Sequence, residues 1–136
     1  MEIIYAIEKD LSVNEFLQVL QNSGLAERRP VDDKDRIIAM LKNSNLIITA
    51  RVNNELIGVA RSLTDFEYAT YLSDLAVSKE FQMLGIGKEL IRHTKKASIQ
   101  AKLILLAAPA AIEYYPNIGM KKHLACFFLD EIDELK

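Results

Sequence analysis

The strongest constraint on the fold is an apolar segment that leads directly into a turn with two glycines, after which a helix begins. It spans Tyr71 to Leu90 and reads YLSDLAVSKEFQMLGIGKEL. The first backbone N–H groups of a helix have no acceptor within the helix, and they lie at the positive end of its dipole. Because Gly85 and Gly87 carry no side chain, an anion can approach these N–H groups closely. The segment therefore predicts an anion site, most naturally for phosphate.

Two common phosphate-binding motifs do not fit this turn. A P-loop requires Ser or Thr after its Gly-Lys pair and another glycine five positions before that pair. Here Glu89 follows Lys88, and Gln82 occupies the earlier position. A dinucleotide-binding fingerprint requires a third glycine where this sequence has Leu90. Both motifs are excluded, so the turn represents a different kind of phosphate site.

The rest of the chain predicts a mixed α/β domain. Runs rich in β-forming residues alternate with amphipathic segments that begin and end at capping signals. Asn53 and Asn54 predict a tight hairpin, because asparagine tolerates positive φ. The predicted order is strand, two helices, three strands, helix, strand, short helix and a final strand. The corresponding ranges are 2–8, 12–24, 32–43, 46–52, 56–64, 68–77, 85–97, 102–107, 109–119 and 121–129.

Composition narrows the class of protein. A chain of 136 residues fits a single domain over 1–136. Its formal net charge of −2 does not favour nucleic-acid binding. No apolar run is long enough to cross a membrane and no secretory signal is visible, so we expect a cytoplasmic protein. Cys126 is the only cysteine and is expected to be a buried small residue, and no residues have the spacing of metal ligands.

Two motifs resemble those of the GNAT acetyltransferases. Residues 82–87, QMLGIG, are similar to the pyrophosphate-binding motif Q/R-x-x-G-x-G/A of that family. Residues 114–120, YYPNIGM, resemble its Phe-Tyr-x-x-x-Gly-Phe signature. The resemblance covers nearly the whole chain and is strongest from Tyr71 to Met120. It implies the GNAT acyl-CoA N-acyltransferase fold, a mixed, mostly antiparallel sheet that is splayed between strands 4 and 5 and flanked by helices.

The resemblance also implies an enzyme, an N-acetyltransferase. Acetyl-CoA would donate its acetyl group by direct attack of a primary amine whose carrier, a small molecule or a protein, the sequence does not identify. No metal is implied, and a homodimer is a family-level expectation. Backbone of the fourth strand would pair with the pantetheine arm, and the turn amides would hold the pyrophosphate. The implied cofactor-binding residues are Leu75, Ala76, Val77, Gln82, Met83, Leu84, Gly85, Ile86, Gly87 and Lys88.

The resemblance also indicates catalytic residues. Tyr115 matches the tyrosine that protonates the departing thiolate, and the alternative is a packing role. Pro116 departs from the family pattern, and proline disfavours helical geometry at the residue before it. The amine must lose a proton, and Asp74 is a candidate base or a structural carboxylate. Glu67, Glu113 or water are the other options for the base.

The acceptor side gives weaker signals. Arg28 and Arg29 lie in the loop after the first predicted helix, where they could bind a carboxylate or phosphate of the substrate, or be simply solvated. An alternative function is a catalytically weak module that senses acyl-CoA. A fold that serves only as a dimerisation scaffold is disfavoured, because the motif from Gln82 to Gly87 is intact.

Overall fold

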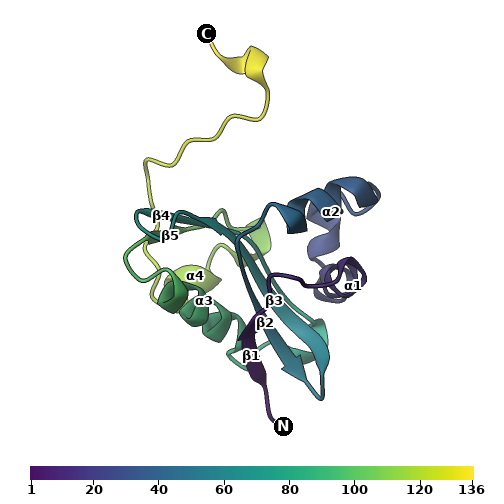
Figure 1. The fold of residues 1–136 in the computed structure, drawn as a ribbon. Helices are drawn as coiled ribbons and strands as arrows, with labels where there is room; N and C mark the ends of the chain where they lie inside the picture. Colours follow the sequence, from purple (N-terminus) through teal and green to yellow (C-terminus); the bar gives the residue numbers. More distant parts are fainter. The chain divides into compact units, whose positions relative to one another are not determined.

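The computed structural model describes residues 1–136, which form two compact units, 1–106 and 107–136. The strands and helices of the first unit are labelled in Figure 1. They are β1 Ile4–Ile7, α1 Val13–Ser23, η1 Leu25–Arg28, α2 Lys34–Lys42, β2 Leu46–Val52, β3 Glu55–Thr64, β4 Ala69–Val77, η2 Lys79–Phe81, α3 Ile86–Ala97 and β5 Lys102–Ile104. The second unit contains η3 Pro109–Ala111, α4 Tyr114–Asn117 and η4 Ile132–Glu134.

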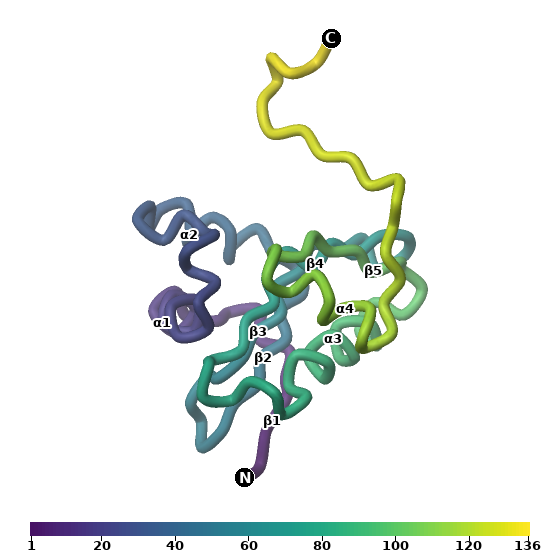
Figure 2. The backbone as a smooth tube through the Cα atoms, turned by 180° about the vertical axis from the view of Figure 1, so that it is seen from behind, coloured from purple at the N-terminus to yellow at the C-terminus, as the bar shows by residue number.

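A mixed sheet lies between two helical layers in the first unit. Its strand order is β1-β2-β3-β4-β5, with antiparallel pairing throughout except between β4 and β5, which are parallel. Helices α1 and α2 cover one face and α3 covers the other, as the views from front and back show (Figures 1 and 2). Phe16, Leu20 and Ile37 fill the first core, and Ile86 and Leu90 fill the second. The predicted fold class is confirmed.

The local sequence signals determine where these elements begin and end. The Ser12 hydroxyl accepts a hydrogen bond from the Glu15 backbone N–H and caps α1, and Gly24 ends this helix with φ 88°. Asp33 caps α2 in the same way. The hairpin between β2 and β3 has positive φ at both Asn53 and Asn54, as the sequence predicts.

The sheet opens between β4 and β5. Only three residues of β4, Ala69 to Tyr71, pair with β5. Strand β4 continues to Val77 with β3 on one side and no strand on the other. The fifth strand therefore ends at Ile104 rather than at position 107, because pairing is what defines the end of a strand.

A bulge lies in β4 where the sheet opens. Arg61 lies opposite Asp74 and Ser62 lies opposite Leu72, so Ser73 is an extra residue with no counterpart on β3. The extra residue of a bulge is unpaired, and it bends and twists the strand locally. The free part of β4 thus begins at a bend.

The bulge also changes which side chains face which helices. Leu72 packs in the core beneath α3, and beyond the bulge Leu75 and Val77 pack against the same core. Ala76 packs in the core beneath α1 and α2. Without the extra residue, the period of two along a strand would place Leu72 and Ala76 on one face. One inserted residue therefore sets the register of the free edge.

The prediction of a final strand over 121–129 is wrong. Within the second unit this segment is irregular, and its large side chains Leu124, Phe127 and Phe128 are exposed. The local pattern favours a strand, but a strand needs a partner for its backbone groups and the second unit contains no other strand. Cys126 is exposed rather than buried for the same reason.

One ion-pair network joins the start of the sheet to α1. Arg51 on β2 donates to both carboxylate oxygens of Glu8, at 2.9 Å each, and to Glu15 at 2.6 Å. These hydrogen bonds from Arg51 lower the pKa of both Glu8 and Glu15. A lowered pKa in the folded state stabilises the protein above the ordinary glutamate pKa, and this stabilisation disappears as the pH falls through the lowered values.

We expect Arg51→Gln to lower the free energy of unfolding by about 1 kcal/mol at pH 7, the scale of a partly exposed ion pair. Urea unfolding at pH 7 and pH 3 measures this. The difference from wild type should be present at pH 7 and should shrink at pH 3, which is below the ordinary glutamate pKa of about 4.3, as the carboxylates take up protons. Arg92→Gln, which removes an exposed pair with Glu89, is the control and should change little at either pH. An Arg51→Gln effect of equal size at both pH values contradicts the prediction.

Candidate functional site

The turn that follows β4 presents a row of free backbone donors. The N–H groups of residues 83–88 have no acceptor within the protein. The φ angle is 67° at Met83 and 81° at Gly85, whereas Leu84 between them has negative φ. Alternating signs of φ turn successive N–H groups toward one concave side, which is a typical anion-binding geometry. The start of α3 adds the positive end of its dipole.

Gly85 makes this turn possible. It caps α3 in the left-handed region, where a side chain is strained. A Cβ built at this position would meet no atom within 4 Å, so the space in front of the turn is open. The Gln82 side chain donates to the Val77 carbonyl at 2.9 Å and ties the turn to the end of β4. Met83 is 99% exposed, consistent with a turn that projects into solvent.

The free edge of β4 leads to this turn. On the side away from β3, no strand pairs with residues 72–77, because β5 pairs no further than Tyr71. The side chains of Leu75, Ala76 and Val77 pack in the two cores. The same residues therefore pack through their side chains and offer their backbone to an extended ligand, which would run along β4 toward the turn.

Asp74 is fully buried at the start of this free edge. One carboxylate oxygen accepts from Nε of Arg29 and the other from Nε of Arg61, each at 2.5 Å. The Asp74 side chain is 0% exposed. Both oxygens are thus held by guanidinium groups, and these contacts favour the structural alternative for Asp74 over the role of a base.

The two arginines of the predicted acceptor loop differ in their surroundings. Arg29 turns inward: besides Asp74, it donates to the Ser73 carbonyl and to the Arg28 carbonyl, each at 2.8 Å. Arg28 is exposed at the end of η1. Of the pair, Arg28 is the one whose side chain faces solvent, where a substrate anion could reach it.

Sequence reasoning missed Arg61 and Ser73. Arg61 is 6% exposed and also donates to the Ser44 hydroxyl at 2.8 Å and to the Ser73 hydroxyl at 2.9 Å. A signal was present, because Arg61 ends the apolar run from Leu56 to Ala60 and a buried arginine requires a buried partner. The bulge at Ser73 has no comparable signature in the sequence.

Tyr115 belongs to the second unit and lies in the short helix α4. Its ring meets the Tyr114 ring edge to face, with centroids 5.2 Å apart. Burial and, to a lesser degree, Tyr114 raise the pKa of the Tyr115 hydroxyl. The expectation that Pro116 disfavours helical geometry at Tyr115 is wrong, because α4 includes both residues. Proline is tolerated there because the first turn of a helix has no internal acceptor for its N–H groups.

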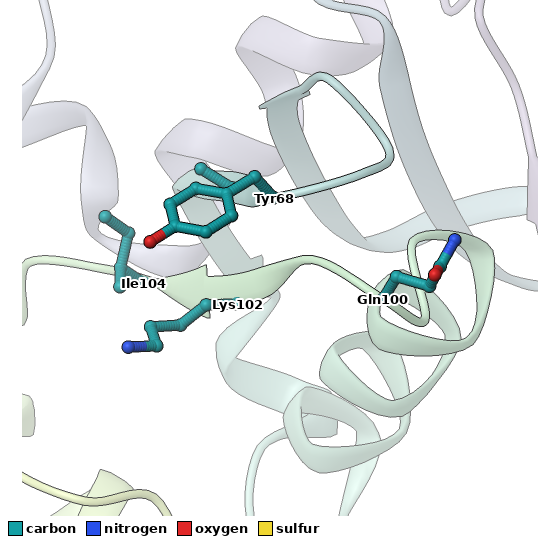
Figure 3. A pocket seen from close by; sticks show the side chains of 5 residues that line it. Tyr68, Gln100, Lys102 and Ile104 are labelled. Carbon is teal, nitrogen blue, oxygen red and sulfur yellow. The ribbon is translucent and has the colours of Figure 1, made fainter.

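An open hollow lies at the other end of β4. It has a volume of about 320 Å³ and is lined by Tyr68, Ala69, Gln100, Lys102 and Ile104. Figure 3 shows Lys102 and Ile104 on β5, Gln100 on the segment before this strand, and the ring of Tyr68, the residue before β4, beside Ile104. The hollow lies at the starts of the two parallel strands, whereas the turn at residues 82–85 follows the end of β4. None of the predicted site residues lines it.

No group of three or more His, Cys, Asp or Glu side chains is arranged to hold a metal ion. No helix has both the length and the apolar character that crossing a bilayer requires.

Comparison with protein families identifies the class. Residues 11–120 match the model of the acetyltransferase (GNAT) family. The chain belongs to this family. It is therefore an acyltransferase of the GNAT type, and acetyl-CoA is the co-substrate of the family. The match includes the turn after β4 and extends through Tyr115 to Met120.

Two curated relatives have names of the same kind. An uncharacterized N-acetyltransferase, ycf52, from Pyropia yezoensis is 28% identical over 129 residues, covering 89% of this chain and 71% of the relative. The chloroplastic GCN5-related N-acetyltransferase 2 of Arabidopsis thaliana is 24% identical over 143 residues, covering 88% of this chain. The chain spans 54% of the length of this second relative.

Solved structures show the same fold. A probable acetyltransferase from meticillin-resistant Staphylococcus aureus superposes with a TM-score of 0.77 at 17% identity, covering 96% of this chain and 100% of the other. The aminoglycoside N-acetyltransferase AAC(6′)-Iy, solved in complex with CoA, gives a TM-score of 0.74 at 13% identity, covering 96% and 95%. At these identities, the likeness establishes the fold.

The two glycines of the turn should respond differently to alanine. Gly85→Ala should lower the free energy of unfolding by about 1–2 kcal/mol, because position 85 requires a left-handed backbone. Gly87→Ala should leave it unchanged or raise it by up to about 1 kcal/mol, because position 87 is helical and alanine is the better helix former. Urea unfolding of both variants measures the pair. Equal losses in the two variants would contradict the assigned turn geometry.

Proposed function

We propose that the protein transfers the acetyl group of acetyl-CoA to a primary amine. The observation that carries this proposal is the combination of acceptor-free N–H groups at residues 83–88 with the unpaired edge of β4 that leads to them. A diphosphate would match the free N–H groups of the turn, and an extended arm that contains amides would match the unpaired edge of β4. The acceptor is an amine of a small molecule or of a protein.

The proposed ligand contacts use backbone more than side chains. The pyrophosphate is held by the amides of the turn and the start of α3, with Lys88 adding charge. The pantetheine amides pair with the backbone of β4, as an added strand would. The CoA complex of the structural neighbour AAC(6′)-Iy supports CoA as the ligand of this fold. The proposed contact residues are Leu75, Ala76, Val77, Gln82, Met83, Leu84, Gly85, Ile86, Gly87 and Lys88.

The proposed reaction is a direct acyl transfer. The neutral amine attacks the thioester carbonyl, the new C–N bond forms, and the C–S bond breaks to release the CoA thiolate. Tyr115 gives its phenolic proton to the sulfur as general acid, and the amine gives up its extra proton. The raised pKa of Tyr115 keeps its hydroxyl protonated at neutral pH, as a general acid must be before it donates.

Water is the proposed acceptor of the amine proton. Asp74 is engaged by two guanidinium groups, which argues against it as the base. Glu67 precedes β4 at the end away from the turn, and its carboxylate accepts from Gln100. A water molecule at the open face of the site could take the amine proton without help from Asp74 or Glu67.

We also propose a single domain over 1–136, a cytoplasmic location and a homodimer. The family match supports the single domain, because it runs from residue 11 to 120 and so includes residues of both units. The cytoplasmic location rests on the sequence and the homodimer on the family resemblance, and the chloroplastic relative from Arabidopsis offers another compartment. An acyl-CoA sensor is the second candidate function, and the inward turn of Arg29 favours it modestly because it leaves only Arg28 facing solvent.

Release of free CoA from acetyl-CoA tests the proposal. A panel of amines, polyamines, amino acids and lysine peptides is offered to wild type and to Tyr115→Phe. We expect at least one amine to stimulate release, and the substitution to slow it by about 10²-fold, within the range for a general acid. Tyr114→Phe is the matched control and should change the rate far less.

Two other outcomes are decisive. Tight CoA binding with no amine-stimulated release would replace the enzyme by the sensor. No binding of CoA would overturn the proposed function altogether.

The pH profile of kcat at saturating amine tests the role of Tyr115. A general acid is active while protonated, and the pKa of Tyr115 is raised. Activity should therefore persist until the pH passes the ordinary tyrosine pKa of about 10, and should fall above it. Tyr115→Phe should lack this alkaline limb. The same limb in the variant would assign it to another group.

A further inference from the structure

We propose that Arg29 is a positioning residue that locks the bulge of β4 and so holds the free edge in the shape that binds acetyl-CoA. This inference rests on the proposed function for its ligand. It assigns Arg29 a role other than that of a substrate anchor. Arg29 comes from the loop after α1, whereas Ser73 and Asp74 lie 44 and 45 residues later in the chain.

The bulge leaves polar groups that need partners. Ser73 is the extra residue, so its carbonyl has no regular place in the ladder with β3. Nη2 of Arg29 donates to this carbonyl at 2.8 Å, while Nε of the same guanidinium donates to Asp74. A single planar fork therefore satisfies the backbone of one residue and the side chain of the next.

Arg61 completes the lock from the other side. It donates from Nη2 to the Ser73 hydroxyl and from Nε to the second oxygen of Asp74. Its Nη1 reaches the Ser44 hydroxyl just beyond α2. The loop after α1, the strands β3 and β4 and the end of α2 thus meet at one carboxylate.

The location of the lock gives it a function. Ser73 and Asp74 lie just beyond Tyr71, the last residue of β4 that pairs with β5, so they stand where the free edge begins. The bulge determines which of residues 75–77 face each core and how their backbone is presented. If the bulge were weakened, the backbone of residues 75–77 would lose its fixed orientation, and this is where the pantetheine arm is proposed to pair.

The contacts of Arg29 also differ from those of an ordinary exposed arginine. Its side chain is 21% exposed, and three of its N–H groups already have acceptors within the protein. A substrate carboxylate would have to compete with Asp74 for it. Arg29→Gln keeps Asp74 paired with Arg61, so we expect the variant to fold, whereas Arg61 variants would leave the carboxylate with only a partly exposed partner.

Two measurements on the ligand-free and CoA-bound protein test the proposal. Hydrogen exchange in the apo protein should be faster at residues 73–77 in Arg29→Gln than in wild type. The Kd for CoA, measured by calorimetry with no amine present, should rise about tenfold, the scale of one hydrogen bond to a charged group. Arg36→Gln, an exposed arginine on α2, is the control and should change neither.

The conservative variant Arg29→Lys separates positioning from charge. A lysine ammonium cannot reproduce the planar fork that spans the Ser73 carbonyl and the Asp74 carboxylate. We therefore expect Arg29→Lys to resemble Arg29→Gln in both exchange and CoA affinity. In a double-mutant cycle, Arg29→Gln and Asp74→Asn should be less than additive in CoA affinity, because they break the same lock.

Three results would overturn the inference. The first is unchanged exchange at residues 73–77 together with an unchanged Kd for CoA in Arg29→Gln. The second is a rise in the KM for an anionic amine alone, rescued by lysine, which would make Arg29 a substrate anchor. The third is full additivity with Asp74→Asn. If wild type binds no CoA, the proposed function fails, while the exchange experiment still decides whether Arg29 locks the bulge.

Discussion

The pairing of the buried Asp74 carboxylate with Arg29 and Arg61 is the interaction on which the arrangement of β4 and its neighbours depends. A fully buried charge is costly unless it is paired and hydrogen-bonded, and here two arginines from different parts of the chain supply both. Their guanidinium groups also hold the extra residue of the bulge. The loop after α1, the bulge and the start of the free edge are therefore joined through the charge of one carboxylate.

The binding site proposed here uses two local departures from regular structure. The first is the bulge in β4, after which the strand has no neighbour on one side. The second is the turn with positive φ at Met83 and Gly85, which leaves a row of N–H groups without acceptors. In each case the protein leaves backbone groups unpaired where a ligand with amides and phosphates can pair with them. The regular elements around them, α1, α2 and α3, supply the packing that keeps these departures in place.

Local signals predicted most of the first unit, because its elements begin and end at residues with strong local preferences. Ser12, Gly24 and the Asn53-Asn54 pair each fix a backbone conformation that neighbouring residues cannot change. The turn with free N–H groups was predictable for the same reason, since two glycines between a strand and a helix allow few alternatives. The family resemblance then supplied the splayed sheet, which no local pattern contains.

Long-range contacts explain what the sequence did not reveal. Arg29 and Asp74 are far apart in the chain, so no local pattern reveals their pairing, and this pairing favours a structural role for both. The strand expected at 121–129 depended on a partner that its local pattern could not provide. The helical geometry of Tyr115 was not expected before Pro116, but proline disfavours it only as a tendency, and here both residues lie in the short helix α4.

The turn at residues 83–88 has a consequence for how such sites diversify. Its donors belong to the main chain, which every amino acid except proline supplies in the same form. Side chains at Met83, Leu84 and Ile86 can therefore be exchanged without altering the number of donors, provided that the glycine at 85 keeps the backbone in its left-handed state. We expect chains of this kind to vary widely in sequence at these positions while the same row of main-chain N–H groups persists.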